Sequence, residues 1–385
     1  MTIPPSVKVG AFMAAMFGTF AIIGSFLSLF LADRGLTATQ IGTVFGLVSL
    51  VRLFAGPSWG MLADRLGQRR NVMAAGAGIA VCTAFSLLGA HDFLLIAIIL
   101  VCQGAAVASL GPLSDSLALG LAREGRMTYG PPRAAGSAAF MLAAALGGQV
   151  LAATGTGVVP LLIAGGFCAC CLIALNLPEP AQPPPARKSR FTGGFSVLRL
   201  PEFRLTLLSS ALVQGSHAAF YSFAPLHWRS LGITDGTIGL LIAVGIVAEV
   251  ALFMWGRRLV EYLGPAGLTG CAAAAGALRW AVTATTGDLA ILFPIQALHA
   301  VTFAFQHQSA MLMLQRVIPH ERASTAQALY GALGMGAPTG LMTFLSGFLY
   351  ARFGGGVYFV MALMCALALP LVPLLRRATK PVPLG

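Results

Sequence analysis

The sequence predicts an all-α membrane protein with twelve transmembrane helices in two pseudo-symmetric six-helix bundles. Three observations lead to this fold class: an apolar composition, the length of the uncharged runs, and a proline-rich basic stretch near the middle of the chain. Hydrophobic residues make up 57% of the 385 positions and charged residues 9%. A water-soluble domain of this size does not tolerate such a balance on its surface.

The spans follow from run length, because a hydrocarbon core of about 30 Å needs about 20 helical residues. Uncharged runs of this order cover residues 9–32, 72–90, 93–114, 205–228, 289–315, 323–351 and 353–375. The runs 36–63, 236–256 and 263–287 each carry one charge, and the run 134–178 holds two helices hinged at Gly155-Thr156-Gly157. Together these runs predict twelve spans.

The charges predict the orientation. Most of the 24 Lys and Arg residues follow the ends of spans on one side, whereas Arg34, Arg229 and Arg352 lie on the other. By the positive-inside rule, both termini are expected in the cytoplasm and the protein in the cell inner membrane. The first span lacks a signal-type cleavage site, so we expect it to be retained.

The stretch 178–202 is rich in proline and then basic, which predicts a cytoplasmic linker between a bundle at 1–177 and a second bundle at 203–385. Six spans per half imply a parallel repeat. Residues 35–67 align without gaps on residues 232–264, with Gly, Thr, Ile and Leu matches near both ends. In this alignment Arg52 lies opposite Glu249.

Five charged residues fall within the predicted spans: Asp115, Arg133, Arg52, Glu249 and Arg279. A charge near the bilayer centre costs roughly 2.5 to 3.5 kcal/mol on insertion scales, so such residues usually face an interior cavity and have a partner. One interpretation is structural pairing between helices. The other is substrate and proton handling, because a buried carboxylate can exchange a proton near neutral pH.

Polar and aromatic residues recur at helical spacing in two spans, which predicts that each set shares one face. The tenth span carries Gln296, His299, Phe303 and then Gln306 and His307; the seventh carries Gln214, His217 and Tyr221, with Phe220 beside them. A single membrane histidine is usually a hydrogen-bonded helix contact. Two on one stripe make a role in proton transfer about equally plausible.

The charged segment from Gly60 to Arg70 resembles the loop between the second and third spans of major facilitator superfamily transporters. The resemblance implies a role in conformational gating for Gly60, Asp64, Arg65, Gly67 and Arg69. The loop lies at the cytoplasmic end of the second span, about two turns beyond Arg52, and is therefore too far out to hold substrate. A weaker second copy runs from Arg257 to Gly264.

Further segments resemble the bacterial 3-phenylpropionate transporter group, which is itself similar to lactose permease-like proton symporters: Tyr129-Gly-Pro-Pro-Arg133, Val247-Ala-Glu249-Val, Arg279-Trp280 and Ala297-Leu-His299. This resemblance implies that Asp115 and Arg133 hold substrate and that Arg279 and His299 take part in proton coupling. Thr302 replaces the glutamate that is central to proton release in the lactose permease type. Coupling would then use Glu249 or Asp115, with His299 or His307.

The sequence therefore predicts a secondary transporter that works by alternating access and takes up a small aromatic acid with a proton. His217, Tyr221 and Phe303 are expected to line the substrate site, where Arg133 and Arg279 offer forks for a carboxylate. An exporter of drugs or metabolites, or a proton symporter of a sugar or nucleoside, remains an alternative.

Other classes fit less well. No metalloprotease motif, nucleophile elbow or nucleotide-binding loop occurs, so we expect no enzyme, no ATP-driven pump, no cofactor and no metal. The Cys168-Ala-Cys170-Cys171 cluster lacks the spacing of a metal site and is expected to pack. The expected partners are substrate, protons and the lipid bilayer, not nucleic acid, and the chain is expected to be a monomer.

Overall fold

The computed structural model describes residues 3–181, 194–319 and 322–378, and the regular structure of these residues is helical throughout. About half of the predicted linker, with Arg187, Lys188 and Arg190, lies outside the described residues.

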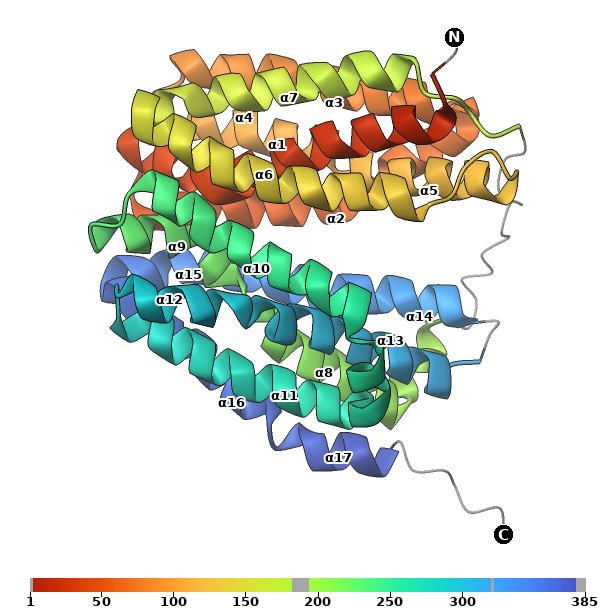
Figure 1. The fold of residues 1–385 in the computed structure, drawn as a ribbon, viewed down its shortest axis with the longest axis vertical. Coiled ribbons are helices and arrows are strands. Elements are labelled where there is room, and N and C mark those ends of the chain that lie inside the picture. The colour runs from red at the N-terminus through yellow and green to blue at the C-terminus, as the bar shows by residue number, and fades with distance from the viewer. Residues whose placement is uncertain (1–2, 182–193, 320–321, 379–385) are drawn as a thin grey trace. The chain divides into compact units, whose positions relative to one another are not determined.

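The first half of the chain folds as predicted, with one break that the length of the uncharged runs did not indicate (Figure 1). Gly155, which has a positive φ of 78°, ends the fifth span, as expected for the hinge. The fourth span is interrupted at Ala108-Ser109. The helices are α1 (Pro5–Asp33), α2 (Ala38–Leu66), α3 (Arg69–Gly89), α4 (Phe93–Val107), α5 (Leu110–Arg123), α6 (Gly130–Thr154), η1 (Thr156–Val158) and α7 (Val159–Leu175).

The second half contains more interruptions. The seventh span breaks at Ser216-His217, and the tenth and eleventh each contain wider π-helical turns, η3 and η5. The elements are η2 (Gly194–Arg199), α8 (Pro201–Gly215), α9 (Ala218–Ser230), α10 (Asp235–Trp255), α11 (Arg257–Thr285), α12 (Leu289–Ala297), η3 (Ala300–Phe305), α13 (Gln306–Val317), α14 (Ala323–Leu329), η5 (Tyr330–Gly336), α15 (Ala337–Phe353), η6 (Gly354–Gly356), α16 (Val357–Ala368) and α17 (Leu371–Ala378).

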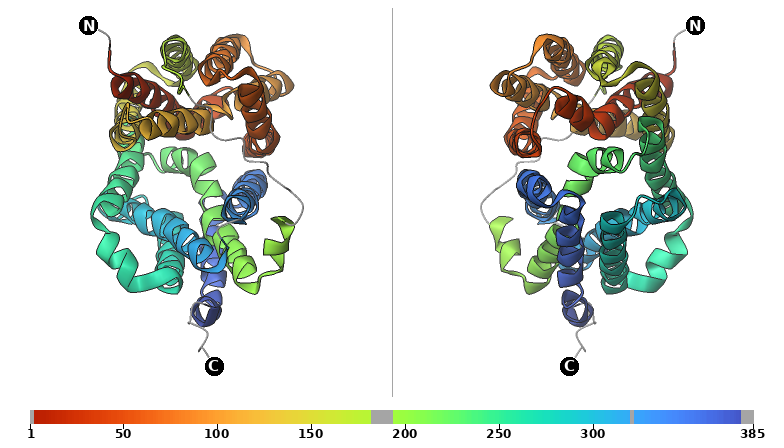
Figure 2. Two further views of the ribbon diagram at one scale, coloured as in Figure 1. Left: turned by 90° about the vertical axis from the view of Figure 1, so that its right-hand side faces the viewer. Right: turned by 90° about the vertical axis from the view of Figure 1, so that its left-hand side faces the viewer.

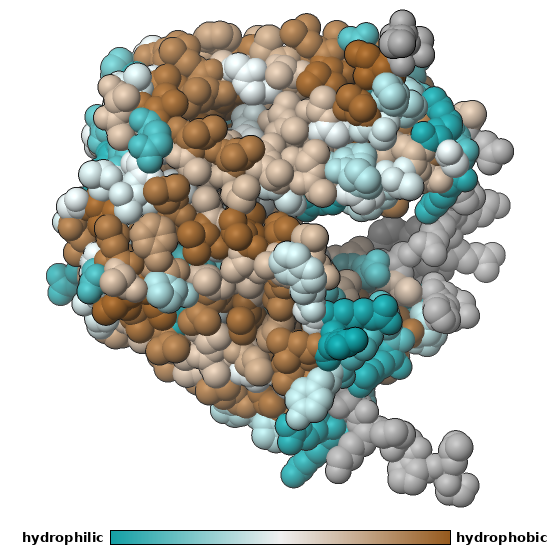
Figure 3. All heavy atoms as spheres, viewed as in Figure 1, coloured by the Kyte–Doolittle hydropathy of each residue, from teal (hydrophilic) through white to brown (hydrophobic). Residues whose placement is uncertain are grey.

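The described helices contain nine segments that are long and apolar enough to cross a membrane. One of them, Thr325–Arg377, has 53 residues and includes both α14–α15 and α16–α17, so it accounts for two passes. The interrupted pair α8–α9 and α11, where Arg279 lowers the hydropathy, supply the other two. The twelve-helix fold class is confirmed, and hydrophobic side chains cover much of the visible flank of each unit (Figure 3).

By contacts the chain forms two units, one of Met1–Arg187 with Trp228–Ala243, the other of Lys188–His227 with Val244–Gly385. Figure 2 shows the helices of each unit packed side by side. Residues Trp228–Ala243 group with the first unit because α6 and α10 approach backbone to backbone. A Cβ on Gly148 would lie 3.2 Å from the Cα of Gly239. The predicted domain boundary at 178–202 does not anticipate this grouping.

Candidate functional site

In the first unit, the site residues predicted from the fourth and fifth spans lie at one end of α5 and α6. The Tyr129 hydroxyl donates a hydrogen bond of 3.0 Å to Oδ1 of Asp115. Arg133 lies one turn further along α6, where its Nη1 donates to Ser137 Oγ at 3.3 Å. Its guanidinium carbon lies 4.4 Å from the ring centroid of Phe17 on α1. The result is a half-buried group with one acid, one base and two aromatic rings.

Tyr129 is the member of this group that the sequence did not single out as a site residue, although it belongs to the quoted Tyr129-Gly-Pro-Pro-Arg133 segment. Burial and the negative charge of Asp115 raise the pKa of Tyr129, so its hydroxyl keeps the proton that it donates. Gly136 allows the ring of Phe17 to reach Arg133, because a Cβ there would lie 2.6 Å from that ring. Arg52, on α2, is exposed and makes no hydrogen bond or ion pair with a described residue of its own unit.

In the second unit, the fully buried guanidinium of Arg279 is the centre of a polar cluster. Nη2 donates to Oε1 of Gln296 at 2.8 Å, and Nη1 lies 3.2 Å from Oγ1 of Thr302. The rings of Phe220 and Trp280 flank the cation, with centroids 4.5 and 4.3 Å from its central carbon. Arg279 is 0% exposed, so in this structure its guanidinium, which was predicted to bind a carboxylate, faces protein groups.

His299 connects this arginine to Glu249. Nη1 of Arg279, which can only donate, lies 3.1 Å from Nδ1 of His299, so this nitrogen must accept. The hydrogen network therefore assigns the imidazole proton to Nε2, which faces Oε2 of Glu249 at 3.4 Å. Gly245, one turn before the glutamate, lets α10 approach α12, since a Cβ there would lie 3.1 Å from the Cβ of His299.

The seventh-span residues meet the same cluster. His217, in the break between α8 and α9, donates from Nδ1 to the carbonyl of Val213 at 3.0 Å, so Nε2 accepts from Thr302 Oγ1 at 3.0 Å. The ring of Tyr221 stacks on His217 and is 41% exposed. Phe303 stacks on His299, with ring centroids 5.5 Å apart. The structure thus brings these predicted substrate residues together around Arg279.

The predicted polar stripe on the tenth span is divided. The π-helical turns of η3 contain an extra residue per turn, which rotates the following helix relative to a regular α-helix. As a result Gln306 points to α8 and donates to Ser210 Oγ at 2.9 Å, while His307 lies beside Tyr330, with ring centroids 6.1 Å apart. His307 has no direct contact with Arg279 or Glu249 among the described hydrogen bonds and ion pairs.

The predicted gating loop is shorter than the sequence indicated. Helix α2 continues through Gly60, Asp64 and Arg65 to Leu66, so that only Gly67 and Gln68 form the turn. Gly67 has a positive φ of 64°, which favours glycine at a helix C-terminus. Asp64, whose side chain is 75% exposed, lies 3.9 Å from the buried Arg69 at the start of α3.

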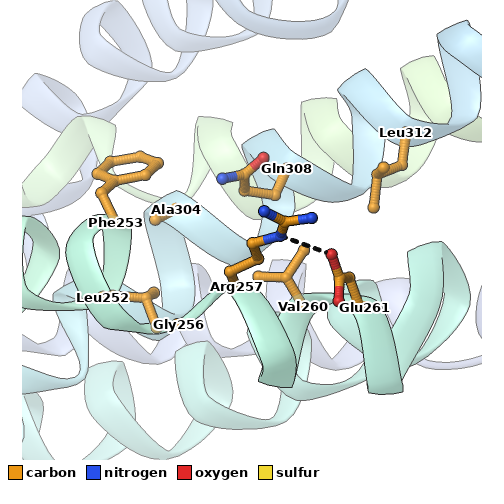
Figure 4. A pocket seen from close by; sticks show the side chains of 9 residues that line it. All are labelled: Leu252, Phe253, Gly256, Arg257, Val260, Glu261, Ala304, Gln308 and Leu312. Carbon is orange, nitrogen blue, oxygen red and sulfur yellow. Dashed lines mark hydrogen bonds and ion pairs between the residues drawn. The ribbon is translucent and has the colours of Figure 1, made fainter. Parts of the chain in front are cut away.

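The second copy of this segment borders a pocket of about 240 Å³ between α10, α11 and α13 (Figure 4). Arg257 donates from Nε to Glu261 at 2.8 Å across its mouth. The lining residues are Leu252, Phe253, Gly256, Arg257, Val260, Glu261, Ala304, Gln308 and Leu312.

A third group of charges lies at the opposite end of the first unit. Arg229 donates two hydrogen bonds to Asp235, at 2.6 and 2.9 Å, and one group, Nη1, lies 3.1 Å from both oxygens of Asp33. Thr156 donates to the same aspartate at 2.6 Å. Asp33 ends α1, where a negative charge is unfavourable without such a partner.

Comparison with known proteins agrees with the class of protein that this architecture defines, a multi-pass membrane transporter. A model of the MFS_1 like family matches residues 7–361. A probable 3-phenylpropionic acid transporter of Escherichia coli strain K12 is 30% identical over 365 residues, which cover 93% of this chain and 94% of that one. A maltose permease of Geobacillus stearothermophilus is 27% identical over 94% and 92%.

Solved structures show the same fold. The nucleoside transporter NupG, as its D323A mutant, superposes with a TM-score of 0.85 over 98% of this chain and all of that one, at 14% identity. A bacterial homologue of the human lysosomal transporter Spinster gives 0.77 over the whole of both chains, at 15% identity. The chain belongs to the MFS_1 like family, and it is a major facilitator superfamily transporter.

Proposed function

We propose that this transporter couples the uptake of a small aromatic carboxylate to the entry of one proton across the cell inner membrane. The observation that carries the proposal is the chain of contacts from Glu249 through His299 to Arg279, surrounded by aromatic rings. This chain combines Glu249, which can bind a proton, with Arg279, a cation that would attract an anionic substrate. The E. coli relative supports the substrate class, because its name gives 3-phenylpropionic acid.

The proton would bind at Glu249. This carboxylate is partly exposed, and its contact with His299 does not bury it completely. When Glu249 is ionised it offsets the charge of Arg279 through the imidazole, and when it is protonated the cluster has a surplus positive charge. Proton binding and anion binding would then favour each other, which is the requirement for symport.

Within each unit, the predicted substrate residues offer groups that suit such a substrate. Arg133 is half-buried and donates to the neutral Ser137 hydroxyl, so its remaining donors suit a carboxylate. Tyr221 and Phe303 offer ring faces for the aromatic group of the substrate. Arg279 would act through its charge, because its guanidinium is enclosed.

Three further features belong to the proposal: cytoplasmic termini, gating through Asp64 and Arg69, and a monomeric working unit. The positive-inside bias supports the first. The long contact of 3.9 Å between the exposed Asp64 and the buried Arg69 supports the second, because such a weak pair can form in one conformation and break in another at little cost.

Uptake into proteoliposomes tests the proposal. Labelled 3-phenylpropionate, maltose and a nucleoside are compared with and without an acidic exterior. We expect saturable uptake of the carboxylate that rises with the pH gradient. Gradient-independent uptake would remove symport, and preference for the sugar or nucleoside would favour the alternative that the maltose permease and NupG suggest. Uptake only in inverted vesicles would instead indicate an exporter.

A further inference from the structure

Arg279 is buried without a carboxylate beside it. Its described side-chain hydrogen bonds go to Oε1 of Gln296, Oγ1 of Thr302 and Nδ1 of His299, all uncharged acceptors. Among the described residues no acid lies within ion-pair distance of its guanidinium, because Glu249 meets the far nitrogen of His299. A buried charge without an adjacent counter-ion is costly, so an uncharged shell around it calls for an explanation.

We propose that this uncharged shell, formed by Thr302 and Gln296, is the determinant that selects anionic over neutral substrates. The inference rests on the proposed function and names the residues that set its charge preference. Because neither side chain neutralises Arg279, the cation is available to attract a substrate anion when Glu249 is protonated. A carboxylate at either position would form an internal ion pair and remove most of that attraction.

Because of this geometry, a substitution at either position tests the inference directly. Thr302 is 0% exposed and its hydroxyl accepts from Arg279 at 3.2 Å, so an aspartate of similar size would place an oxygen next to the guanidinium. Gln296 accepts at 2.8 Å through Oε1, and its Nε2 has no hydrogen-bond partner. Glutamate at this position would keep the shape of the side chain and would leave no hydrogen-bond donor unsatisfied.

The field of Arg279 reaches the open side of the cluster through a short path. Thr302 touches His217, and Tyr221 stacks on His217 while remaining 41% exposed. The intervening Thr302 and His217 are both buried, and charges interact over longer distances in such surroundings than in water. The carboxylate of a substrate whose ring packs on Tyr221 would therefore sense whether Arg279 is neutralised.

The experiment measures kcat/KM for 3-phenylpropionate and for its uncharged amide, with the full-length protein in proteoliposomes. We expect Thr302→Asp and Gln296→Glu each to lower the carboxylate-to-amide ratio by about tenfold or more, which corresponds to about 1.4 kcal/mol. Thr302→Asn is the matched control, since it differs from aspartate in charge and not in size. It should keep the ratio within about threefold, less than 0.7 kcal/mol.

Each outcome of this experiment either supports or contradicts the inference. If the asparagine variant loses as much selectivity as the aspartate variant, the effect is one of packing, and the inference fails. It also fails if the variants keep the wild-type ratio while their thermal unfolding shows that they are folded. Wild-type protein that does not transport the carboxylate, or that prefers the amide, overturns the proposed function itself and the inference with it, and this is visible before any variant is made.

Discussion

Glu249→Gln should separate substrate movement from proton movement. The change keeps the size of the side chain and replaces the carboxylate that faces Nε2 of His299 at 3.4 Å with an amide. Within the described part of the Arg279 cluster, Glu249 is the one acid, so the proposed stoichiometry is one proton per substrate. The variant has no group there that can carry this proton.

The size of the effect follows from that stoichiometry. One proton and one monocarboxylate move without net charge, so a gradient of one pH unit should drive about tenfold accumulation, equivalent to about 1.36 kcal/mol. In Glu249→Gln the final inside-to-outside ratio should fall to about one, while exchange of internal for external substrate continues. A membrane potential alone should drive no accumulation in the wild type, although each net charge would gain about 2.3 kcal/mol per 100 mV.

Proteoliposomes with an imposed pH gradient, and separately with an imposed potassium diffusion potential, supply both measurements. Glu261→Gln is the matched control, because it makes the same substitution in the same unit at an exposed pair with Arg257. That variant should accumulate substrate as the wild type does. Continued gradient-driven accumulation by Glu249→Gln, or accumulation by the wild type on potential alone, would refute the assignment of the proton to Glu249.

Three further groups of variants have defined outcomes. Arg229→Gln and Asp33→Asn should each lower the free energy of unfolding by about 1 to 2 kcal/mol, because part of this network is exposed, and the double variant should lose less than the sum in a thermal-unfolding cycle. Asp64→Asn should slow turnover with little effect on substrate affinity; a loss of binding with intact turnover would contradict the gating role. Gly166→Ala should destabilise by about 1 to 3 kcal/mol because its Cβ would overlap a buried threonine, whereas neighbouring Gly165→Ala meets open space and should not. Equal unfolding temperatures for the two alanine variants would contradict that packing argument.

The spans were predictable because the bilayer imposes a simple physical rule. A helix that crosses hydrocarbon must be long and apolar, and the sequence shows this directly in each half. The hinge at Gly155 was also predictable, since glycines between two apolar runs are a local signal for a turn. In the structure Gly155 has a positive φ. Family membership followed from the Gly60 to Arg70 segment and agrees with the comparisons.

The interruptions inside the spans were not predictable in the same way. The break at Ser216-His217 and the π-helical turns of η3 contain no proline. Ala108, by contrast, stands four residues before Pro112, a spacing at which proline removes a helical hydrogen bond. Partners from other helices stabilise such irregular backbone. Gln214, for example, donates to the carbonyl of Phe303 at 3.2 Å. A helical-wheel argument that assumes 3.6 residues per turn therefore placed His307 on the same face as His299.

The same limit explains why the identity of the charged residues was evident but their pairing was not. Arg279 was recognisable as an intramembrane charge, yet its partners come from α12 and η3, and its flanking rings include one from α9. Only the structure shows that these partners are uncharged. Thr302 was notable in the sequence as the absence of a family glutamate; in the structure it is a hydroxyl 3.2 Å from a buried cation. The absence of a carboxylate at position 302 leaves Arg279 without an acid next to its guanidinium. The proposed preference for anionic substrates depends on this.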